Sequence, residues 1–523
     1  MMNYDGTQYN NRKNMCRPNT SIETRRVIIA GAGPGGLLLQ ALLHHRNKTS
    51  SSTSRTIYET TLIESRADLG ILNQEELQAH RSWMIGLANH GLEAVRSVPD
   101  LFEKYIDGIG VDVNEFNIFL GSKKITGSQP SLEKSKKSES FIVDRNFIVA
   151  ALARYANEEL KHNEHYHAKY DTEMLYVDHT NHRVLVRNKQ TSDEEYISYD
   201  LLVGADGVRS TVREALVKRH FDFELSVGDI FQCFKAVHIK CPEAVCPTAL
   251  SVMPNCLPNF NGIVLPETGG IVNMSLGVPR NHFDSNISDD IKSDDANVVC
   301  EYFKKNFKCF KLTEEGYMDL ATQWVNQRWN RTGMVHCNRY SSLECKIILM
   351  GDAAHATSPS IGMGMNTALR DAQKLYELLD KFEDDLDQVL PEFSRIRVPE
   401  GNALSDLAMH LYCFDTKIGA KTMVKGLIRG GLNKLFPRLV DPDCQAYLGQ
   451  TGYSLTDVYQ KATEQGILST HRATNERIRQ EFFERQIGMI VDKPKSSVWK
   501  YFTFAISVAV AACGIAMKKK SSV

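Results

Sequence analysis

Glycines and an acidic residue near the start of the chain have the spacing of a site for a dinucleotide. The run Val27–Gly36 reads VIIAGAGPGG, so Gly31, Gly33 and Gly36 form a G-x-G-x-x-G pattern. In such a pattern the first glycine permits a tight turn, the second lets the backbone approach a pyrophosphate, and the third lets a helix pack closely on a strand. Glu64, beyond the next apolar run, can accept hydrogen bonds from ribose hydroxyls. Glycines after a strand can also serve only to turn the chain, so further signals are needed.

Two later segments repeat the arrangement of a short apolar run followed by an acid. Leu201–Arg213 reads LLVGADGVRSTVR and carries Asp206, and Ile347–Asn366 reads IILMGDAAHATSPSIGMGMN and carries Asp352. An acid directly after a parallel strand lies at the edge of an open α/β sheet where ligands bind. A helix is predicted to start near Asn366, and its N-terminus could hold an anion. Asp352 has a second interpretation as a helix N-cap, which is compatible with the first.

The elements that must hold these residues are strands of one parallel sheet, each followed by a helix. Buried strands are predicted at 27–30, 60–63, 201–203 and 347–350. The interval from Gly36 to Glu64 is longer than the usual ~20 residues, and the polar run Asn47–Arg55 accounts for the excess as a surface loop. The predicted fold class is therefore α/β, with a Rossmann-like dinucleotide-binding domain.

Together the three segments resemble the dinucleotide fingerprint, the D-G motif and the G-D motif of the class A FAD-dependent aromatic monooxygenases, which share the para-hydroxybenzoate hydroxylase fold. Within this family the chain most resembles the kynurenine 3-monooxygenases. That similarity is carried by Asp380–Met409 (DKFEDDLDQVLPEFSRIRVPEGNALSDLAM), Arg81–Leu87 (RSWMIGL) and Gly364–Asn366. It extends over residues 25–455 and is thin from 221 to 335. The resemblance implies bound FAD, NADPH as a transient co-substrate, and O₂.

The resemblance also assigns roles to the residues that match the family's motifs. For the adenosine half of FAD these are Gly31, Gly33, Gly36 and Glu64. For the pyrophosphate, the ribitol and the flavin edge they are Arg81, Arg145, Asp206 and Asp352, of which Asp206 is also expected to serve the nicotinamide donor. For the loop beside the isoalloxazine they are Pro359, Gly362, Gly364, Met365 and Asn366. Each arginine could instead form an ordinary surface ion pair.

One expected substrate contact is missing. Kynurenine hydroxylases bind the substrate carboxylate with an arginine on a strand in front of the flavin, and alignment on Gly121–Lys124 puts Glu115 at that position. No arginine or lysine occurs from Gly110 to Leu120. Because two desolvated carboxylates repel each other, this places kynurenine in question as the substrate. In the other interpretation Glu115 points to solvent and another base serves, since a shift of one residue reverses the face of a strand. The remaining substrate-pocket candidates are Asn366, His410 and Tyr412.

Length, charge and cysteine content favour a large enzyme over a nucleic-acid-binding protein. The 523 residues give room for several cores. The net charge of −1 provides no basic field for nucleic acid. The 12 cysteines form no C-x-x-C pair and have no zinc-type spacing with histidine, so no metal site is predicted. Free thiols in a reducing, cytosol-facing compartment are expected. The oligomeric state is left open.

The predicted domains are not contiguous in the chain. The expected parts are a disordered polar N-terminus at 1–24, an FAD-binding domain at 25–111, 141–220 and 335–399, a substrate domain with a mainly antiparallel sheet at 112–124 and 221–333, a helical region at 400–490, and a transmembrane helix at 498–517. The second domain is expected to roof the substrate pocket, and the helical region to cover it.

The transmembrane helix is predicted from the composition of the C-terminal segment. Tyr501–Met517 (YFTFAISVAVAACGIAM) contains no charged residue and would span about 26 Å as a helix, close to a thin bilayer core. Lys518, Lys519 and Lys520 follow it directly. A tail anchor with the body facing the cytosol is therefore predicted, and a buried core helix is the other interpretation. The family resemblance implies the mitochondrial outer membrane, with the endoplasmic reticulum as the alternative.

These observations predict a membrane-anchored FAD enzyme that uses NADPH and O₂ to hydroxylate a small aromatic substrate, with kynurenine-like 3-hydroxylation in first place. No second G-x-G-x-x-G is present, so the donor is expected to bind in the flavin cleft. One alternative is a monooxygenase or epoxidase of a neutral lipophilic substrate. The other is a catalytically weakened flavin-binding scaffold at the membrane, which the missing arginine favours and the intact glycine, D-G and G-D motifs oppose.

Overall fold

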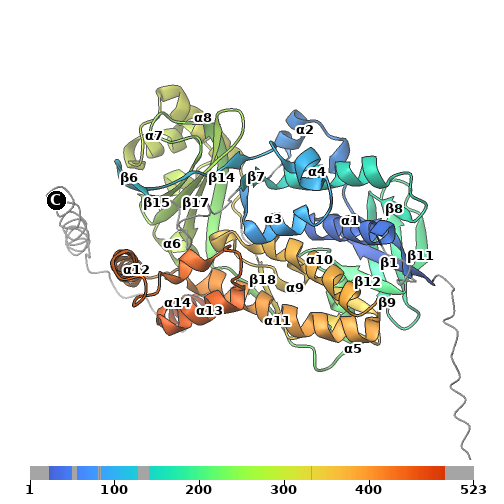
Figure 1. The fold of residues 1–523 in the computed structure, drawn as a ribbon. Coiled ribbons are helices and arrows are strands. Elements are labelled where there is room, and N and C mark those ends of the chain that lie inside the picture. The colour runs from blue at the N-terminus through green and yellow to red at the C-terminus, as the bar shows by residue number, and fades with distance from the viewer. Residues whose placement is uncertain are drawn as a thin grey trace, which may run out of the picture.

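A six-stranded sheet, here called the parallel sheet, carries the three motif segments (Figure 1). The computed structural model describes residues 23–49, 56–80, 82, 84–127, 141–330 and 333–488. The strands of the parallel sheet, in order, are β19 (Ser341–Ser342), β20 (Ile347–Leu349), β12 (Leu201–Gly204), β1 (Glu23–Ala30), β2 (Thr56–Ile63) and β8 (Tyr166–Lys169). All neighbours run parallel except β19, which pairs antiparallel at the edge. The predicted N-terminal lead-in therefore ends earlier than expected, because residues 23 and 24 already belong to β1.

The helix after the glycine turn is buried almost all round. α1 (Pro34–Thr49) begins with a proline, which suits the first helical position because its missing N–H needs no partner there. The run from Leu37 to Leu43 is buried, so this helix lacks a polar face in its first turns. It packs against α10 (Gly364–Lys381) and α4 (Arg145–Tyr155), and the three helices share one core with the parallel sheet.

A second six-stranded sheet, here called the mixed sheet, stands beside the first. Its order is β14 (Gln232–Lys240), β17 (Ile271–Pro279), β16 (Phe260–Pro266), β15 (Ala249–Leu257), β5 (Glu115–Leu120) and β6 (Lys123–Gly127). The neighbours pair antiparallel except β15 and β5, which run parallel. The sequence predicts a mainly antiparallel sheet, and this parallel pair is the departure from it.

The two faces of the mixed sheet have different partners. Its outer face packs under α7 (Ala296–Asn306) and α8 (Glu314–Asn326), where Trp324 is fully buried. Its inner face presents Leu250 and Leu265, which pack against Met84 and Ile142. The latter two belong to a small sheet of β3 (Met84–Leu87), β7 (Phe141–Asp144) and β4 (Val111–Asp112). The inner face is therefore the one turned toward α4 and the motif segments.

The remaining elements complete the two bodies and the C-terminal region. They are α2 (Gln74–Ala79), α3 (Asn89–Arg96), α5 (Thr211–Arg219), α6 (Arg280–Ser285), α9 (Asp352–His355), α11 (Leu386–His410), α12 (Thr416–Leu435), α13 (Leu455–Glu464), α14 (Ile467–Gln486), the three-stranded sheet β9 (Thr172–Asp178), β10 (Arg183–Asn188) and β11 (Glu194–Ser198), and the ribbon of β13 (Leu225–Asp229) with β18 (Gly333–Cys337). The region predicted to be helical contains the end of α11 and all of α12 to α14 (Figure 1).

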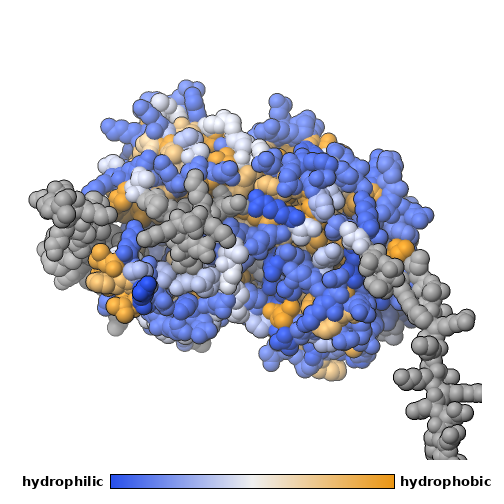
Figure 2. Space-filling view, viewed as in Figure 1, coloured by the Kyte–Doolittle hydropathy of each residue, from blue (hydrophilic) through white to orange (hydrophobic). Residues whose placement is uncertain are grey.

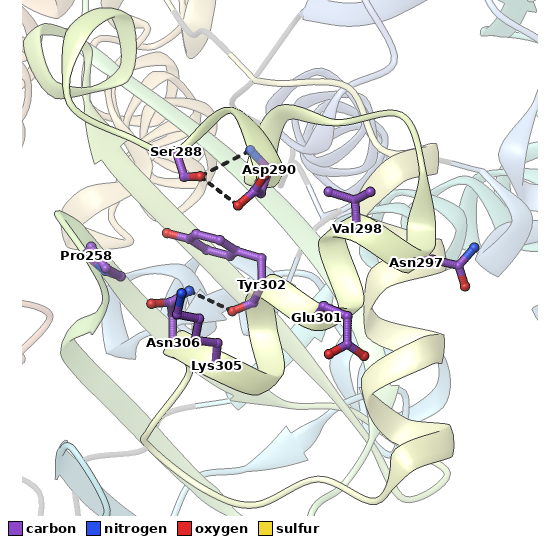
Figure 3. Close-up of a pocket in the computed structure, with 9 residues that line it drawn as sticks. All are labelled: Pro258, Ser288, Asp290, Asn297, Val298, Glu301, Tyr302, Lys305 and Asn306. Carbon is purple, nitrogen blue, oxygen red and sulfur yellow. Dashed lines mark hydrogen bonds between the residues drawn. The ribbon is translucent and has the colours of Figure 1, made fainter.

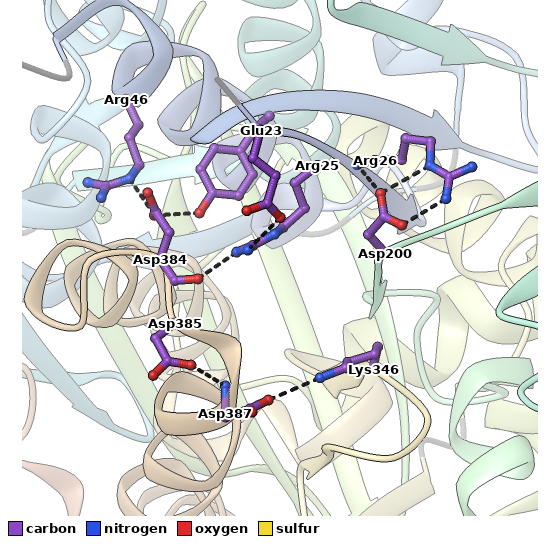
Figure 4. A network of polar contacts seen from close by, with 10 residues as sticks. Glu23, Arg25, Arg26, Arg46, Asp200, Lys346, Asp384, Asp385 and Asp387 are labelled. Carbon is purple, nitrogen blue, oxygen red and sulfur yellow. Dashed lines mark hydrogen bonds and ion pairs between the residues drawn. The ribbon is translucent and has the colours of Figure 1, made fainter. Parts of the chain in front are cut away.

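The turn between α10 and α11 is tied to the parallel sheet through Asp384 (Figure 4). The Asp384 carboxylate accepts hydrogen bonds from Arg46 Nε at 2.9 Å and from the Tyr58 hydroxyl at 2.5 Å, and its backbone carbonyl accepts one from Arg25 at 2.6 Å. Asp384 is buried, so these bonds offset the cost of removing its charge from water. The contact fixes α10, which carries Asn366, against α1.

Within the part of the chain that the structure describes, no helix has both the length and the apolar character that a membrane crossing requires. The predicted transmembrane helix at 498–517 lies outside the described residues.

Candidate flavin site

The first and third glycines of the fingerprint are required by close backbone packing. Gly31 has a φ of +103°, and its N–H donates to the carbonyl of Ile63 at 2.7 Å. A Cβ at Gly31 would collide with the carbonyl of Ala205, and a Cβ at Gly36 would collide with the carbonyl of Gly31. A Cβ at Gly33, in contrast, would meet no atom within 4 Å. Gly33 therefore leaves open space at the N-terminus of α1, where an anionic pyrophosphate would be stabilised.

Glu64 is buried at the end of β2, and its carboxylate already has partners. It accepts hydrogen bonds from the Ala32 N–H at 2.8 Å, from the Arg66 N–H at 3.0 Å and from Arg66 Nε at 2.9 Å. Burial acts to raise its pKa, but the Arg66 guanidinium and these N–H groups hold the pKa below the usual value. Glu64 is thus an ionised brace of the glycine turn, and it borders a small cavity of about 10 Å³ that Asp68 and Tyr170 also line.

Asp206 follows β12 and has one carboxylate oxygen without a partner. Its Oδ2 accepts hydrogen bonds from the N–H groups of Thr211 at 2.8 Å and Val212 at 3.2 Å, at the start of α5. Its buried Oδ1 makes no hydrogen bond within the described residues. Burial raises the pKa of this carboxyl. A buried oxygen without a partner is uncommon in folded proteins, and a ligand donor would satisfy it.

Asp352 and Arg145 lie within electrostatic reach of each other. Asp352 is exposed at the first position of α9, directly after β20. Its interpretation as an N-cap is wrong, because Gly351, with a φ of +58°, occupies that position. Arg145 opens α4, where burial lowers its pKa while the charges of Asp352 and Glu64 act in the opposite direction. Three predicted residues from separate segments therefore converge at the edge of the parallel sheet.

A buried ionic cluster below the Gly351–Asp352 turn was not predicted from the sequence. Asp371 on α10 accepts hydrogen bonds from the Gly351 N–H at 2.8 Å, from His355 Nε2 at 2.7 Å and from Arg397 Nε at 2.6 Å. All three side chains are buried. Burial acts to raise the pKa of Asp371, but Arg397 and His355 outweigh it and lower the pKa to about 2. The i, i+4 spacing of helical residues could not reveal this cluster, since it joins three elements.

Asn366 is a structural brace rather than a residue open to a substrate. Its side chain is fully buried; Nδ2 donates to the carbonyls of Gly86 at 2.8 Å and Gly362 at 3.0 Å, and Oδ1 accepts from the Ala88 N–H at 2.9 Å. Its amide hydrogens are therefore used within the protein. It joins the segment after β3 to the first turn of α10, which begins at Gly364, two residues before the predicted start.

The other predicted residues of this loop are placed as follows. Met365 packs against the core of the parallel sheet, and Gly362 has a φ of +66°, which allows the turn before α10. Ser360 on the same loop donates to the Ala408 carbonyl at 2.6 Å, so α11 supports the loop from behind. Arg81 lies outside the described residues.

Glu115 does not face the motif segments. On β5, Phe119 points to the outer face, where its ring lies 5.7 Å from that of Phe310 under α7 and α8. Side chains alternate along a strand, so Glu115, four residues earlier, shares this outer face. Phe116 pairs with Leu250 and therefore lies on the inner face. Of the two interpretations of Glu115, this geometry favours the one in which the carboxylate does not face a substrate.

The inner face instead carries a polar cluster that the sequence did not indicate. His238 Nδ1 lies 2.7 Å from Glu267 Oε2, and His238 Nε2 lies 3.3 Å from Asn273 Nδ2. Ser275 donates to Asn273 Oδ1 at 3.1 Å. Burial acts to lower the pKa of His238, but Glu267 and, more weakly, Asp144 raise it above the usual value. Glu267 and Asp144 thus favour the protonated form of this ring, whereas the Asn273 amide nitrogen beside Nε2 favours the neutral form; the ring lies close to the residue that precedes Arg145.

The two candidates in the C-terminal region lie apart from this face. His410 is buried between α11 and α14, where burial and the charge of Arg472 lower its pKa to about 4. Tyr412 is exposed, and its backbone carbonyl accepts a hydrogen bond from Asn475 at 2.9 Å. The structure thus gives both residues a place against α14, and it does not bring them to His238.

A surface depression of about 670 Å³ lies on α7, away from all of these residues (Figure 3). Its polar contacts are local, as in the bond from Ser288 to Asp290. No predicted site residue lines it. Among the described residues, no cluster of histidine, cysteine or carboxylate side chains could hold a metal ion.

Comparison with known proteins agrees with the geometry of the motif segments. Residues 24–406 match the family described as the FAD binding domain. The chain belongs to this family. It is 27% identical over 399 residues to kynurenine 3-monooxygenase of Sus scrofa, covering 75% of this chain and 77% of that protein. It is 24% identical over 432 residues to violacein synthase of Chromobacterium violaceum, covering 80% and 92%. The tetrameric form of 2-methyl-3-hydroxypyridine-5-carboxylic acid oxygenase shares the fold, with a TM-score of 0.54 at 18% identity over 78% and 94% of the two chains.

The chain is therefore an enzyme, a class A FAD-dependent aromatic monooxygenase with NAD(P)H as its reductant. The described residues fit FAD: the open space at Gly33, the cation of Arg145 and the unpartnered oxygen of Asp206 suit a pyrophosphate and its hydroxyl-bearing neighbours. These relatives favour neither the epoxidase of a lipophilic substrate nor the inactive scaffold.

Proposed function

We propose that this enzyme hydroxylates the ring of a kynurenine-like aromatic amino acid, with NADPH as the donor and O₂ as the oxygen source. The observation that carries the proposal is the similarity to kynurenine 3-monooxygenases, which spans three quarters of the chain and therefore both sheets. The objection raised by Glu115 loses its force, because that carboxylate shares the outer face with Phe119.

In this mechanism the residues of the protein position the cofactor and the substrate and exclude water. Bound FAD would supply the redox and oxygen-transfer chemistry. The N-terminus of α1, with Gly33, would hold the pyrophosphate, Arg145 would neutralise its charge, and Asp206 Oδ1 would accept a hydrogen bond from the cofactor. Leu250 packs against the apolar cluster of Met84 and Ile142, which joins the mixed sheet to the small sheet; exclusion of water there would favour oxygen transfer over release of the reducing equivalents as hydrogen peroxide.

The proposed substrate contact is His238. It carries a raised pKa, its side chain is 31% exposed, and its buried partner Glu267 fixes the ring. With Nδ1 on Glu267, a protonated imidazole would bind a carboxylate through Nε2 in a charge-assisted hydrogen bond that replaces the contact with the Asn273 amide. His238 would thus take the part that an arginine on β5 takes in kynurenine hydroxylases, and Phe116 and Leu250 would supply the apolar surface for the ring.

The test is a substrate screen on the full-length enzyme. NADPH oxidation, hydrogen peroxide release and hydroxylated product are measured in parallel with kynurenine, with other aromatic amino acids and with neutral aromatics. Kynurenine should stimulate NADPH oxidation with near-stoichiometric product. Stimulation only by neutral aromatics, or peroxide in place of product with every amino acid, would contradict the proposed substrate class.

We also propose that Tyr501–Met517 anchors the enzyme in the mitochondrial outer membrane. The support is the uncharged run itself, followed by three lysines. A reporter that carries residues 494–523 should resist carbonate extraction and co-fractionate with that membrane. Recovery of the reporter in the soluble fraction would disprove the anchor.

A further inference from the structure

α12 stands out because it is a long helix with little cover. None of its side chains that the structure describes is buried, and it packs against the body through α14. Ile428 is 54% exposed and Leu435 71% exposed. The chain just after the helix continues in the same way, with Phe436 at 52% and Leu439 at 83%. Figure 2 shows this hydrophobic patch in orange at the left edge, where Figure 1 places α12.

The exposed apolar residues share a stripe of the helix with cations. Lys421, Lys425, Ile428, Leu432 and Leu435 are spaced by four, three, four and three residues, which places them on one face. The stripe is cationic in its first half and apolar in its second. All five side chains are exposed.

The charge of this segment differs from that of the whole protein. Residues 416–440 contain six basic side chains and no acidic one, whereas the protein has a net charge of −1. The six are Lys417, Lys421, Lys425, Arg429, Lys434 and Arg438. Arg429 donates to the Asp441 carbonyl, a backbone group, so this contact does not neutralise its charge.

We propose that α12 docks on the surface of a lipid bilayer that contains anionic lipid, with the end around Leu435, Phe436 and Leu439 inserted among the acyl chains. Exposed apolar side chains gain free energy by leaving water, and neighbouring cations gain from anionic headgroups. A nucleic acid would satisfy the cations but leave the apolar end in water. A second copy of the chain would cover the apolar end but bring equal cations together.

The test uses the full-length enzyme with single tryptophan substitutions. Leu435→Trp reports on the apolar end, and Ile71→Trp, at a residue 74% exposed on the opposite body, is the matched control. Each is mixed with phosphatidylcholine vesicles, with or without phosphatidylserine, whose acyl chains carry bromine as a quencher. The unsubstituted enzyme gives the background from the native tryptophans.

With phosphatidylserine present, we expect the fluorescence contributed by Leu435→Trp to fall at least two-fold and that of Ile71→Trp to stay unchanged. The triple variant Lys417→Glu, Lys421→Glu and Lys425→Glu, added to Leu435→Trp, should lose this quenching at least in part. Vesicle flotation, read in the same samples, reports attachment of the whole chain by any other segment.

Three outcomes would overturn the proposal. The first is a Leu435→Trp chain that floats with the vesicles while its introduced tryptophan stays unquenched, because α12 is then off the membrane. The second is quenching that is equal on neutral vesicles and in the triple variant. The third is burial of the reporter without vesicles together with a doubled mass in solution, which would assign the patch to a second copy.

Discussion

At the residue scale, the glycines of the first motif meet two different requirements: Gly33 leaves space for a ligand, and Gly36 allows close packing of the backbone. Gly33 faces open space, whereas Gly36 touches the carbonyl of Gly31. We expect Gly33→Val to fold normally but to lose most of its FAD, because its side chain would fill the space that a pyrophosphate needs. The measurement is the flavin-to-protein absorbance ratio together with the thermal unfolding midpoint. Gly430→Val is the control, since that glycine also has no neighbour within 4 Å but lies on α12.

Gly36→Ala should instead lower the stability of the fold. Its Cβ would collide with the Gly31 carbonyl, so the expected result is a lower unfolding midpoint before any effect on the flavin is considered. Full FAD content in Gly33→Val, or normal stability in Gly36→Ala, would contradict the assignment of these two glycines.

His238 gives a prediction that depends on pH. The pKa of His238 is raised by Glu267, so the cation that binds a carboxylate is present below this raised pKa and is lost as the pH rises through it. His238→Asn should raise KM for a carboxylated substrate about ten-fold, or ~1.4 kcal/mol, with little change in kcat. Glu267→Gln should shift the rise in KM to lower pH. An amide analogue of the substrate serves as the control, and an equal rise in its KM would argue for a purely structural role.

At this scale the motif residues could be predicted from the sequence, but the residues that hold them in place could not. Gly31 and Glu64 were predicted because their spacing follows from local turns, and Arg145 because it matches a motif of the family. The face of Glu115 stayed open between two interpretations because one residue of register reverses it. His238 was missed because a histidine in an apolar strand has no local signature, and its meaning comes from Glu267, which lies just after the end of β16.

At the element scale, the Gly351–Asp352 turn depends on α10 and α11 through Asp371. Asp371→Asn leaves Arg397 buried without a carboxylate, so we expect a loss of about 3–5 kcal/mol in the free energy of unfolding. The measurement is urea denaturation near pH 7. Asp387→Asn, which breaks only the ion pair between α11 and Lys346 in the turn before β20, should cost less than about 1 kcal/mol.

The pH dependence of this cluster has a defined sign. The pKa of Asp371 falls from 3.8 to about 2 on folding, so its stabilisation is present above the unfolded value and is lost as the pH falls through the lower one. A stability difference between wild type and Asp371→Asn that persists unchanged below pH 2 would contradict an ionic origin.

Four strands of the parallel sheet, β1, β2, β12 and β20, could be predicted because each is a short apolar run that leads into a glycine or an acid, whereas β8 and β19 lack such a run and were not predicted. The parallel pairing of β5 with β15 could not be predicted, because these strands are separated by more than a hundred residues and neither sequence specifies the direction of its partner. Asn366 shows the same limit: its motif position was found, but its contacts with Gly86 and Ala88 depend on how β3 packs against α10.

At the scale of the whole molecule, the reactivity of the cysteine thiols reports whether the hydrophobic cores are intact. The chain has 12 cysteines, and of the ten that the structure describes seven are buried, namely Cys233, Cys256, Cys300, Cys309, Cys337, Cys345 and Cys444. Burial also raises the pKa of Cys337 to about 11, which keeps it protonated. We expect no more than five thiols to react with a thiol reagent in the native enzyme and all 12 after unfolding. Rapid native reaction of more than five would show that one of the cores is open.

The mixed sheet is built from two separate stretches of the chain, and this affects how the protein is made. β5 and β6 are synthesised well before β15, the strand that pairs with β5. At about 5–20 residues per second, the ribosome needs on the order of ten seconds to reach β15. During that interval Phe116, Ile118 and Phe119 have no sheet to join and could pair with another nascent chain. Lys123 and Lys124 begin β6, the strand that remains at the edge in the folded enzyme, and charged edge strands resist such pairing. These two lysines therefore protect the enzyme against aggregation during its synthesis.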